Sequence, residues 1–188
     1  MQTVGLHKPI QIANVDYLVQ SLSKAGMLMK IEILGIDHIY IAVSDLLQST
    51  TFYDKVMRLL GFHKGTDSIG GQPHVHYFNY AIQYTIRPAK TGAAMHDPFV
   101  PGLHHLCFQV ANRDVVDKIA GGLQKLSIEV SEPRIYPDYG VDYYAIYFKD
   151  PDNIELEVVN RTKIRNIIQN NWEKLEHFEN PLSKAGLI

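Results

Sequence analysis

Four residues of this chain could together hold a divalent metal ion: His38, Gln83, His105 and Glu157. Each lies in a short run of alternating apolar and polar residues, which is the pattern of a half-buried strand. Imidazole nitrogens and carboxylate oxygens suit Zn, Ni, Co, Mn or Fe(II). Two histidines with one carboxylate leave further coordination positions open, and substrate oxygens bind at such positions. The residue types therefore predict a metal centre that handles an oxygen-bearing small molecule.

The adjacent histidines in "GLHHLCFQV" compete for one ligand position. Successive side chains of a strand point to opposite faces. The apolar face of this strand consists of Leu106, Phe108 and Val110. We therefore expect His105 on the other face, beside Cys107. His104 falls at the very start of the strand, where we expect it to lie at the edge, so the alternation selects His105 as the ligand.

The ligand positions assigned to Glu157 and Gln83 each have an alternative residue. Glu157 shares its predicted face with Glu155, and Gln83 shares its face with Thr85. A carboxylate on an otherwise apolar strand costs several kcal/mol to bury unless it meets a cation or strong donors, which is the reason to assign a metal to Glu157. Gln83 would complete a set of four ligands, whereas Thr85 in its place would leave two histidines and one glutamate.

The elements that must position these residues occur twice along the chain. The stretch "DHIYIAVSDL" at residue 37 returns as "HHLCFQVANR" at residue 104, an offset of 67 residues. Asp45 and Asn112 are matching N-cap candidates, and the apolar spacing after them predicts amphipathic helices over 46–60 and 113–126. Runs of β-branched and aromatic residues then predict strands, separated by turn-forming stretches such as "GTDSIGGQP".

This duplication predicts an α+β fold in which two tandem βαβββ modules form one curved mixed β-sheet cup, with the helices outside it. Amphipathic patterns at both ends predict helical extensions, including one helix within residues 163–178. The expected boundaries are 1–32 for a partly helical N-terminal extension, 33–88 for module 1, 89–102 for a linker, 103–160 for module 2, and 161–188 for a C-terminal helix and tail.

The composition is that of an ordinary soluble protein with small-molecule partners. The chain has 188 residues, is 46% hydrophobic, carries a formal net charge of -2 at pH 7 and contains one cysteine. This charge offers no general attraction for nucleic acid or an anionic membrane. The single Cys107 excludes an intrachain disulfide, and no apolar run is long enough to span a bilayer. We expect a cytoplasmic protein, with a homodimer as one option.

Three stretches resemble the vicinal oxygen chelate superfamily, which includes glyoxalase I, fosfomycin-resistance enzymes, extradiol dioxygenases and bleomycin-binding proteins. They are "DHIYIAVSDLLQSTTFYDKVMRLLGF", "GLHHLCFQV" and "YYAIYFKDPDNIELEVV". The resemblance implies that His38, His105 and Glu157 are metal ligands, with Gln83 at the fourth position. The turn "DPDN" lacks the glycine of the family's usual pattern, so Glu155 stays an alternative to Glu157.

The resemblance implies three functions. The first, which we expect, is a metal-dependent isomerase, lyase or epimerase that chelates two adjacent substrate oxygens and stabilises an enediolate-type intermediate, with Glu157 and Gln83 as catalytic groups. The second is an Fe(II) extradiol-type dioxygenase, favoured if Thr85 replaces Gln83. Its acid and base groups would be His74, His76 and Tyr143. The third is a metal-free small-molecule binding protein of the bleomycin-resistance type.

Overall fold

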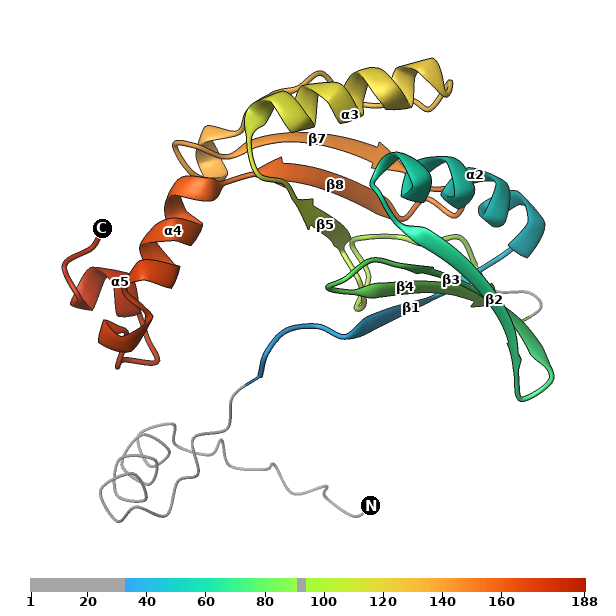
Figure 1. Cartoon of the computed structure of the whole chain (residues 1–188), viewed down its shortest axis with the longest axis horizontal. Coiled ribbons are helices and arrows are strands. Elements are labelled where there is room, and N and C mark those ends of the chain that lie inside the picture. The colour runs from blue at the N-terminus through green and yellow to red at the C-terminus, as the bar shows by residue number, and fades with distance from the viewer. Residues whose placement is uncertain (1–32, 91–93) are drawn as a thin grey trace, which may run out of the picture. The chain divides into compact units, whose positions relative to one another are not determined.

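The computed structural model describes residues 33–90 and 94–188, and the duplicated elements follow in the predicted order. Module 1 consists of β1 (His38–Val43), α2 (Leu46–Leu59), β2 (His63–Ile69), β3 (Gln72–Phe78) and β4 (Gln83–Pro88). Module 2 consists of β5 (His105–Gln109), α3 (Arg113–Lys125), β6 (Arg134–Ile135), β7 (Tyr144–Lys149) and β8 (Glu155–Asn160). The predicted α+β class with two βαβββ modules is confirmed (Figure 1).

Each module contributes one four-stranded sheet. The strand orders are β1-β4-β3-β2 and β5-β8-β7-β6. The first strand of each module is parallel to the last, and the other neighbours are antiparallel. No hydrogen-bonded ladder joins the two sheets among the described strands, so the mixed sheet is divided into two halves. In each half, the edge strand with the predicted histidine pairs directly with the strand that carries Gln83 or Glu157.

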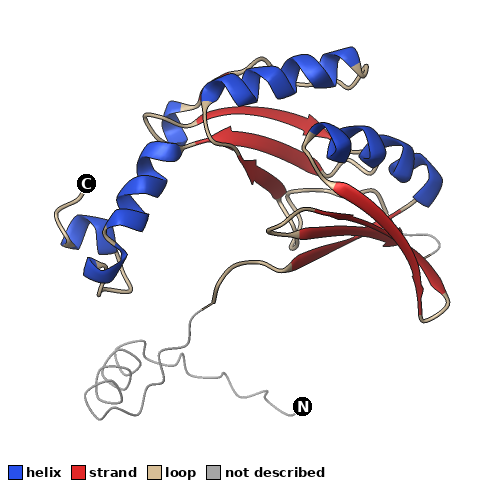
Figure 2. Cartoon of the chain, in the orientation of Figure 1, coloured by secondary structure: helices blue, strands red, loops and turns tan. Residues whose placement is uncertain are grey.

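Side-chain caps begin both long helices where the sequence predicts them. The Asp45 carboxylate accepts hydrogen bonds from the backbone N–H groups of Leu47 at 2.8 Å and Gln48 at 3.0 Å. The Asn112 side chain accepts one from Val115 N at 3.1 Å. Such caps satisfy N–H groups that have no partner within the helix. Each helix packs on the sheet of its own module (Figure 2), which leaves the opposite sheet face for the predicted ligands.

The hairpin of β2 and β3 departs from the sequence prediction. The stretch "GTDSIGGQP" is predicted as a turn, but residues 65–69 belong to β2 and Gln72 begins β3. The turn consists of Gly70 and Gly71, whose φ angles of 60° and 75° are left-handed. Two positive φ angles in a two-residue loop match the twist of the flanking strands. Because β2 is an edge strand with mostly exposed residues, it lacks the apolar alternation that would have identified it.

One hydrophobic core runs through both modules. Its buried side chains come from α2, α3 and the strands beneath them. The two helices approach closely at Gly122 of α3, where an added Cβ would lie 2.7 Å from Cδ1 of Leu59 on α2. Residues 36–188 therefore form one compact unit.

A buried hydrogen-bond network also joins the modules. The Tyr53 hydroxyl lies 2.7 Å from the Tyr84 hydroxyl and donates to Asp150 Oδ2 at 2.8 Å. Asp150 Oδ1 accepts two backbone N–H groups of the turn between β7 and β8. Burial raises the pKa of the Asp150 carboxyl, although its donors act in the opposite direction. Because Tyr84 lies on β4 and Asp150 precedes β8, the network ties together the last strands of the two modules.

Replacing Tyr53 by Phe should lower the free energy of unfolding by about 1–3 kcal/mol, because the buried Asp150 carboxyl loses one of its donors. Urea denaturation followed by circular dichroism measures this change. Tyr80→Phe is the matched control, since the Tyr80 side chain is fully exposed and its hydroxyl should contribute almost nothing. Equal unfolding midpoints for the two variants would contradict the role given to the network.

The residues after β8 form two short helices, α4 (Thr162–Asn170) and α5 (Pro181–Lys184). The single helix predicted within 163–178 is therefore wrong in length. The Asn171 side chain donates to the Ile167 carbonyl oxygen at 2.8 Å and occupies an acceptor at the end of α4. The N-terminal helix predicted within 1–32 lies outside the described residues. Within the described ranges, no helix is both long enough and apolar enough to cross a membrane.

Candidate functional site

Module 2 brings two of the predicted ligands together. His105 on β5 and Glu157 on the adjacent β8 alternate with Leu106 and Leu156, which pack into the core. His105 Nε2 lies 3.2 Å from Glu157 Oε2. Two ligand atoms at about 2.1 Å from one ion stand roughly 3.0–3.4 Å apart at octahedral or tetrahedral angles. The observed separation therefore fits two positions around a shared cation.

Glu157 is a fully buried carboxyl group beside ring nitrogen Nε2 of His105. Neither of its oxygens has a hydrogen-bond partner of good geometry in the described part of the chain. Tyr143 and Tyr147 lie beside it. Burial, followed by the effect of the Glu157 carboxylate, raises the pKa of both phenols, which therefore stay protonated. An uncompensated buried carboxylate costs several kcal/mol, and a cation held by Glu157 and His105 would offset that cost.

Module 1 holds the other pair of predicted ligands. His38 on β1 lies opposite Gln83 on β4. The Gln83 amide nitrogen donates to Thr85 Oγ1 at 3.1 Å and lies 3.3 Å from His76 Nδ1, which leaves the amide oxygen as the atom that can reach an ion. Thr85 is fully buried, and its hydroxyl also lies 2.9 Å from His76 Nδ1. Thr85 and His76 thus contact the amide nitrogen of Gln83, and Gln83 as the ligand stays a prediction.

The other candidate acid and base groups differ in their surroundings. His76 contacts Gln83, and Tyr143 lies beside Glu157. His74 is buried, and its Nδ1 lies 2.8 Å from the Gln72 carbonyl oxygen. His74 is therefore engaged by the hairpin backbone, whereas His76 and Tyr143 lie next to predicted ligands.

The residue before each predicted histidine ligand contacts the same ring nitrogen. Asp37 Oδ2 is 2.8 Å from His38 Nδ1, and His104 Nδ1 is 2.8 Å from His105 Nδ1. A partner at Nδ1 leaves Nε2 for a metal and orients the ring. His104 does lie at the strand edge, as expected. The contacts that Asp37 and His104 make with the histidine rings were not predicted from the sequence. The 67-residue offset nevertheless relates Asp37 to His104, as it relates His38 to His105.

The two pairs of predicted ligands do not form one cluster within the chain. Across 33–90 and 94–188, the three His, Cys, Asp or Glu side chains whose ligand atoms all lie within 4.8 Å of one another are His104, His105 and Glu155. His38 is outside this group, and its side chain is 54% exposed. The chain therefore presents two half-sites, one on each module, and Glu155 lies beside the second.

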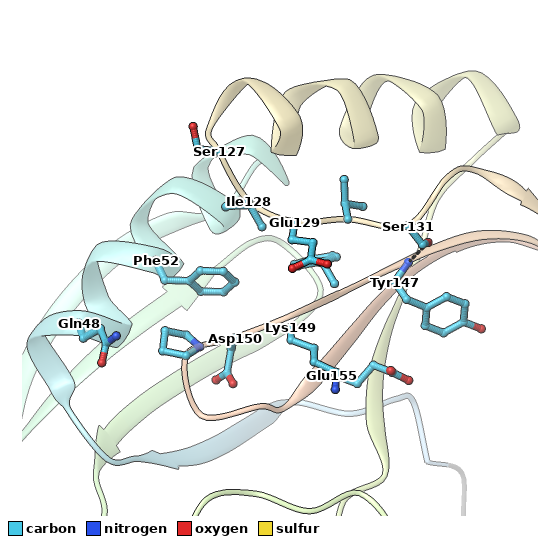
Figure 3. A pocket seen from close by; sticks show the side chains of 13 residues that line it. Gln48, Phe52, Ser127, Ile128, Glu129, Ser131, Tyr147, Lys149, Asp150 and Glu155 are labelled. Atoms are coloured by element: carbon cyan, nitrogen blue, oxygen red, sulfur yellow. Dashed lines mark hydrogen bonds between the residues drawn. The ribbon is translucent and has the colours of Figure 1, made fainter.

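A cavity of about 240 Å³ opens over the half-site of module 2. Its walls are His104, His105, Tyr139, Tyr143, Tyr147, Glu155 and Arg161. A larger groove of about 720 Å³ runs between α2, the segment after α3, and β7, with Phe52, Glu129 and Lys149 along it (Figure 3). None of the four predicted ligands lines this groove. The smaller cavity is the better candidate for a substrate site because His105 opens into it.

Comparisons with known proteins agree with this architecture. A family model described as Glyoxalase/Bleomycin resistance protein/Dioxygenase superfamily matches residues 35–158. Similar solved structures include a glyoxylase/bleomycin resistance protein/dioxygenase domain from Frankia sp. EAN1pec, with 22% identity and a TM-score of 0.58 over 69% of this chain and 98% of that chain. Lactoylglutathione lyase from Agrobacterium tumefaciens has 18% identity and a TM-score of 0.52, over 71% and 98%. A genomically encoded fosfomycin resistance protein from Listeria monocytogenes has 19% identity and a TM-score of 0.51, over 69% and 94%. A search of curated proteins finds no match.

Proposed function

Because the chain belongs to the glyoxalase/bleomycin resistance protein/dioxygenase superfamily, we propose that it is a metal-dependent enzyme acting on a small molecule with two adjacent oxygens. The reaction is of the isomerase, lyase or epimerase class. The observation that supports this proposal is the buried Glu157 carboxylate, which has no hydrogen-bond partner of good geometry in the described part of the chain and lies 3.2 Å from His105 Nε2. A bound cation would offset the cost of burying this carboxylate further than His105 and the neighbouring tyrosines do.

Four residues would hold the ion: His38, Gln83, His105 and Glu157. The contacts at Nδ1 leave Nε2 of each histidine as the donor atom. Zn, Ni, Co, Mn and Fe(II) all accept nitrogen and oxygen donors of this kind. A bound ion would supply Lewis-acid stabilisation of the negative charge that develops on two adjacent substrate oxygens.

The protein's own groups then handle the proton. Glu157 would act as the base for a proton on the carbon next to the chelated oxygens if its carboxylate leaves the metal, and the same carboxyl group would return the proton to the product. The Gln83 amide nitrogen contacts Thr85 and His76. The amide oxygen would therefore face the substrate from module 1. Tyr143 and Tyr147 remain protonated and are therefore hydrogen-bond donors at the cavity wall.

A second copy of the chain would complete the centre. Within one chain the two half-sites are separate, and edge strand β1 leaves both His38 and Tyr40 exposed. In a twofold dimer, module 1 of one copy can face module 2 of the other, which creates two identical centres. The dimer is thus part of the proposed function, because neither copy alone supplies all four ligands at one point.

Solvent deuterium exchange tests the proposed reaction. The full-length protein, loaded with Co(II), Ni(II), Zn or Fe(II), is incubated in D2O with S-lactoylglutathione or with dihydroxyacetone, and NMR follows the carbon-bound protons. We expect deuterium to enter next to the chelated oxygens, and we expect a chelator to abolish this exchange. Exchange that persists without metal would contradict the proposal. Oxygen uptake with a catechol, or bleomycin binding by metal-free protein, would instead support one of the two other functions.

A further inference from the structure

Arg161 is a positively charged residue in the cavity of module 2. The proposed reaction assigns no role to it. Arg161 directly follows β8 and precedes α4, four positions after Glu157. Its guanidinium lies over the Tyr143 ring, 5.5 Å from the ring centroid. The same cavity wall includes His105, so a ligand bound there can contact both the guanidinium and the metal half-site.

Apart from the Tyr143 ring, the Arg161 guanidinium has no acidic partner within residues 33–90 and 94–188. Arg161 Nε is buried and makes no hydrogen bond within the described ranges, and no ion pair involves Arg161 there. Leaving such a donor unsatisfied costs about 1–3 kcal/mol. A guanidinium presents a planar fork of N–H groups that matches both oxygens of a carboxylate. The cavity therefore contains a desolvated donor whose best complement is an anion from outside the chain.

The charges of the cavity would also favour an anionic ligand if a metal were bound. Glu155 lines the cavity and Glu157 lies buried beside it, so these two carboxylates by themselves would repel an anion. A divalent cation would offset these two carboxylates and leave the charge of Arg161 in excess. The three tyrosines of the wall offer ring surface to a short carbon chain. Metal and Arg161 together favour a ligand with acidic groups at both ends.

We infer that Arg161 is the receptor for a second acidic group of the substrate, and that the substrate class is a small dicarboxylic 2-hydroxy or 2-oxo acid. One end of this molecule chelates the metal through adjacent oxygens, and the distal carboxylate pairs with the guanidinium. This inference rests on the proposed metal centre and narrows its substrates. Arg161 acts in binding and selection, while the proton step belongs to other groups.

The test compares two probes that differ only at the distal end: 2-hydroxyglutarate, a diacid, and 2-hydroxypentanoate, its monoacid counterpart. Isothermal titration calorimetry measures their binding to Co(II)-loaded full-length protein. We expect the diacid to bind at least about 10-fold more tightly, the factor that a hydrogen-bonded charge pair supplies. Arg161→Gln should remove this preference and leave monoacid binding and Co(II) content unchanged. Arg134→Gln is the matched control, because Arg134 also lies over a tyrosine ring but is exposed and outside the cavity.

Each other outcome has a definite meaning. Equal affinities for the two acids in the wild type, no binding of either acid, or a preference that survives Arg161→Gln would overturn the inference. Loss of Co(II) from Arg161→Gln would also overturn it, because Arg161 would then support the metal site. If that variant does not fold, Arg161→Met, which also removes the charge, decides: an unchanged preference overturns the inference, and a reduced one supports it. A wild-type protein that binds no Co(II) contradicts the proposed function itself.

Discussion

Glu157→Gln should weaken divalent metal binding by at least about 100-fold, since even the loss of an outer-shell partner costs 10- to 100-fold. The amide has the shape of the carboxylate but no charge, so it holds a divalent cation less strongly than the carboxylate does. The same change should make the metal-free protein more stable, by about 1 kcal/mol, because it removes a fully buried charge whose oxygens have no hydrogen bond of good geometry. Metal should therefore raise the melting temperature of the wild type and leave that of the variant unchanged.

Glu155→Gln is the matched control for this prediction. Glu155 lies two positions earlier on the same strand, β8, and is partly exposed at the cavity. We expect this variant to keep its metal and its metal-dependent rise in melting temperature. The reverse result, in which Glu155→Gln loses the metal and Glu157→Gln keeps it, would place the ion on the His104, His105 and Glu155 group and would show the Glu157 assignment to be wrong.

Mixing two inactive variants should restore metal binding if the centre lies between two copies of the chain. His38→Ala removes a ligand from module 1, and Glu157→Gln removes one from module 2. In a mixed dimer, one centre carries both changes and the other carries neither. Random pairing then restores about one quarter of the wild-type centres. Co-refolding the two variants and measuring bound Co(II) by its absorbance checks this number, and size-exclusion chromatography with light scattering checks that a dimer is present.

The control mixture combines His105→Ala with Glu157→Gln. Both changes lie on module 2, so every centre in a mixed dimer contains one of them and no binding should return. Recovery in this mixture would mean that the ligands are divided differently between copies. No recovery in either mixture, with a monomer in solution, would mean that one chain closes around the ion by itself, and the proposed dimer would be abandoned.

Local rules identified much of this protein from its residues. The repeated spacing located both modules, the polar side chains of Asp45 and Asn112 marked the starts of α2 and α3, and alternation placed His105 and Glu157 on the non-core face of their sheet. These features depend on backbone geometry within a few residues, which the sequence encodes directly. The extent of β2 was not predicted because an exposed edge strand needs no apolar face. The length of α4 was not predicted because the helix ends where the Asn171 side chain donates to a backbone carbonyl oxygen.

The tertiary structure decided the chemistry of the site. Residues far apart in the chain surround Glu157 and Arg161. Only folding therefore shows that the Glu157 carboxyl is fully buried without a hydrogen bond of good geometry, and that Arg161 makes no ion pair within the described ranges. The alternation of apolar and polar residues is the same in both modules and predicts that their polar faces meet at one metal centre. The positions of the two half-sites are instead set by the packing of the helices in the shared core. Burial, charge pairing and contacts between strands all depend on the whole fold. The sequence alone therefore determined which residues have side chains of a metal-binding type, and only the packing of the two modules decided which of them meet within one chain.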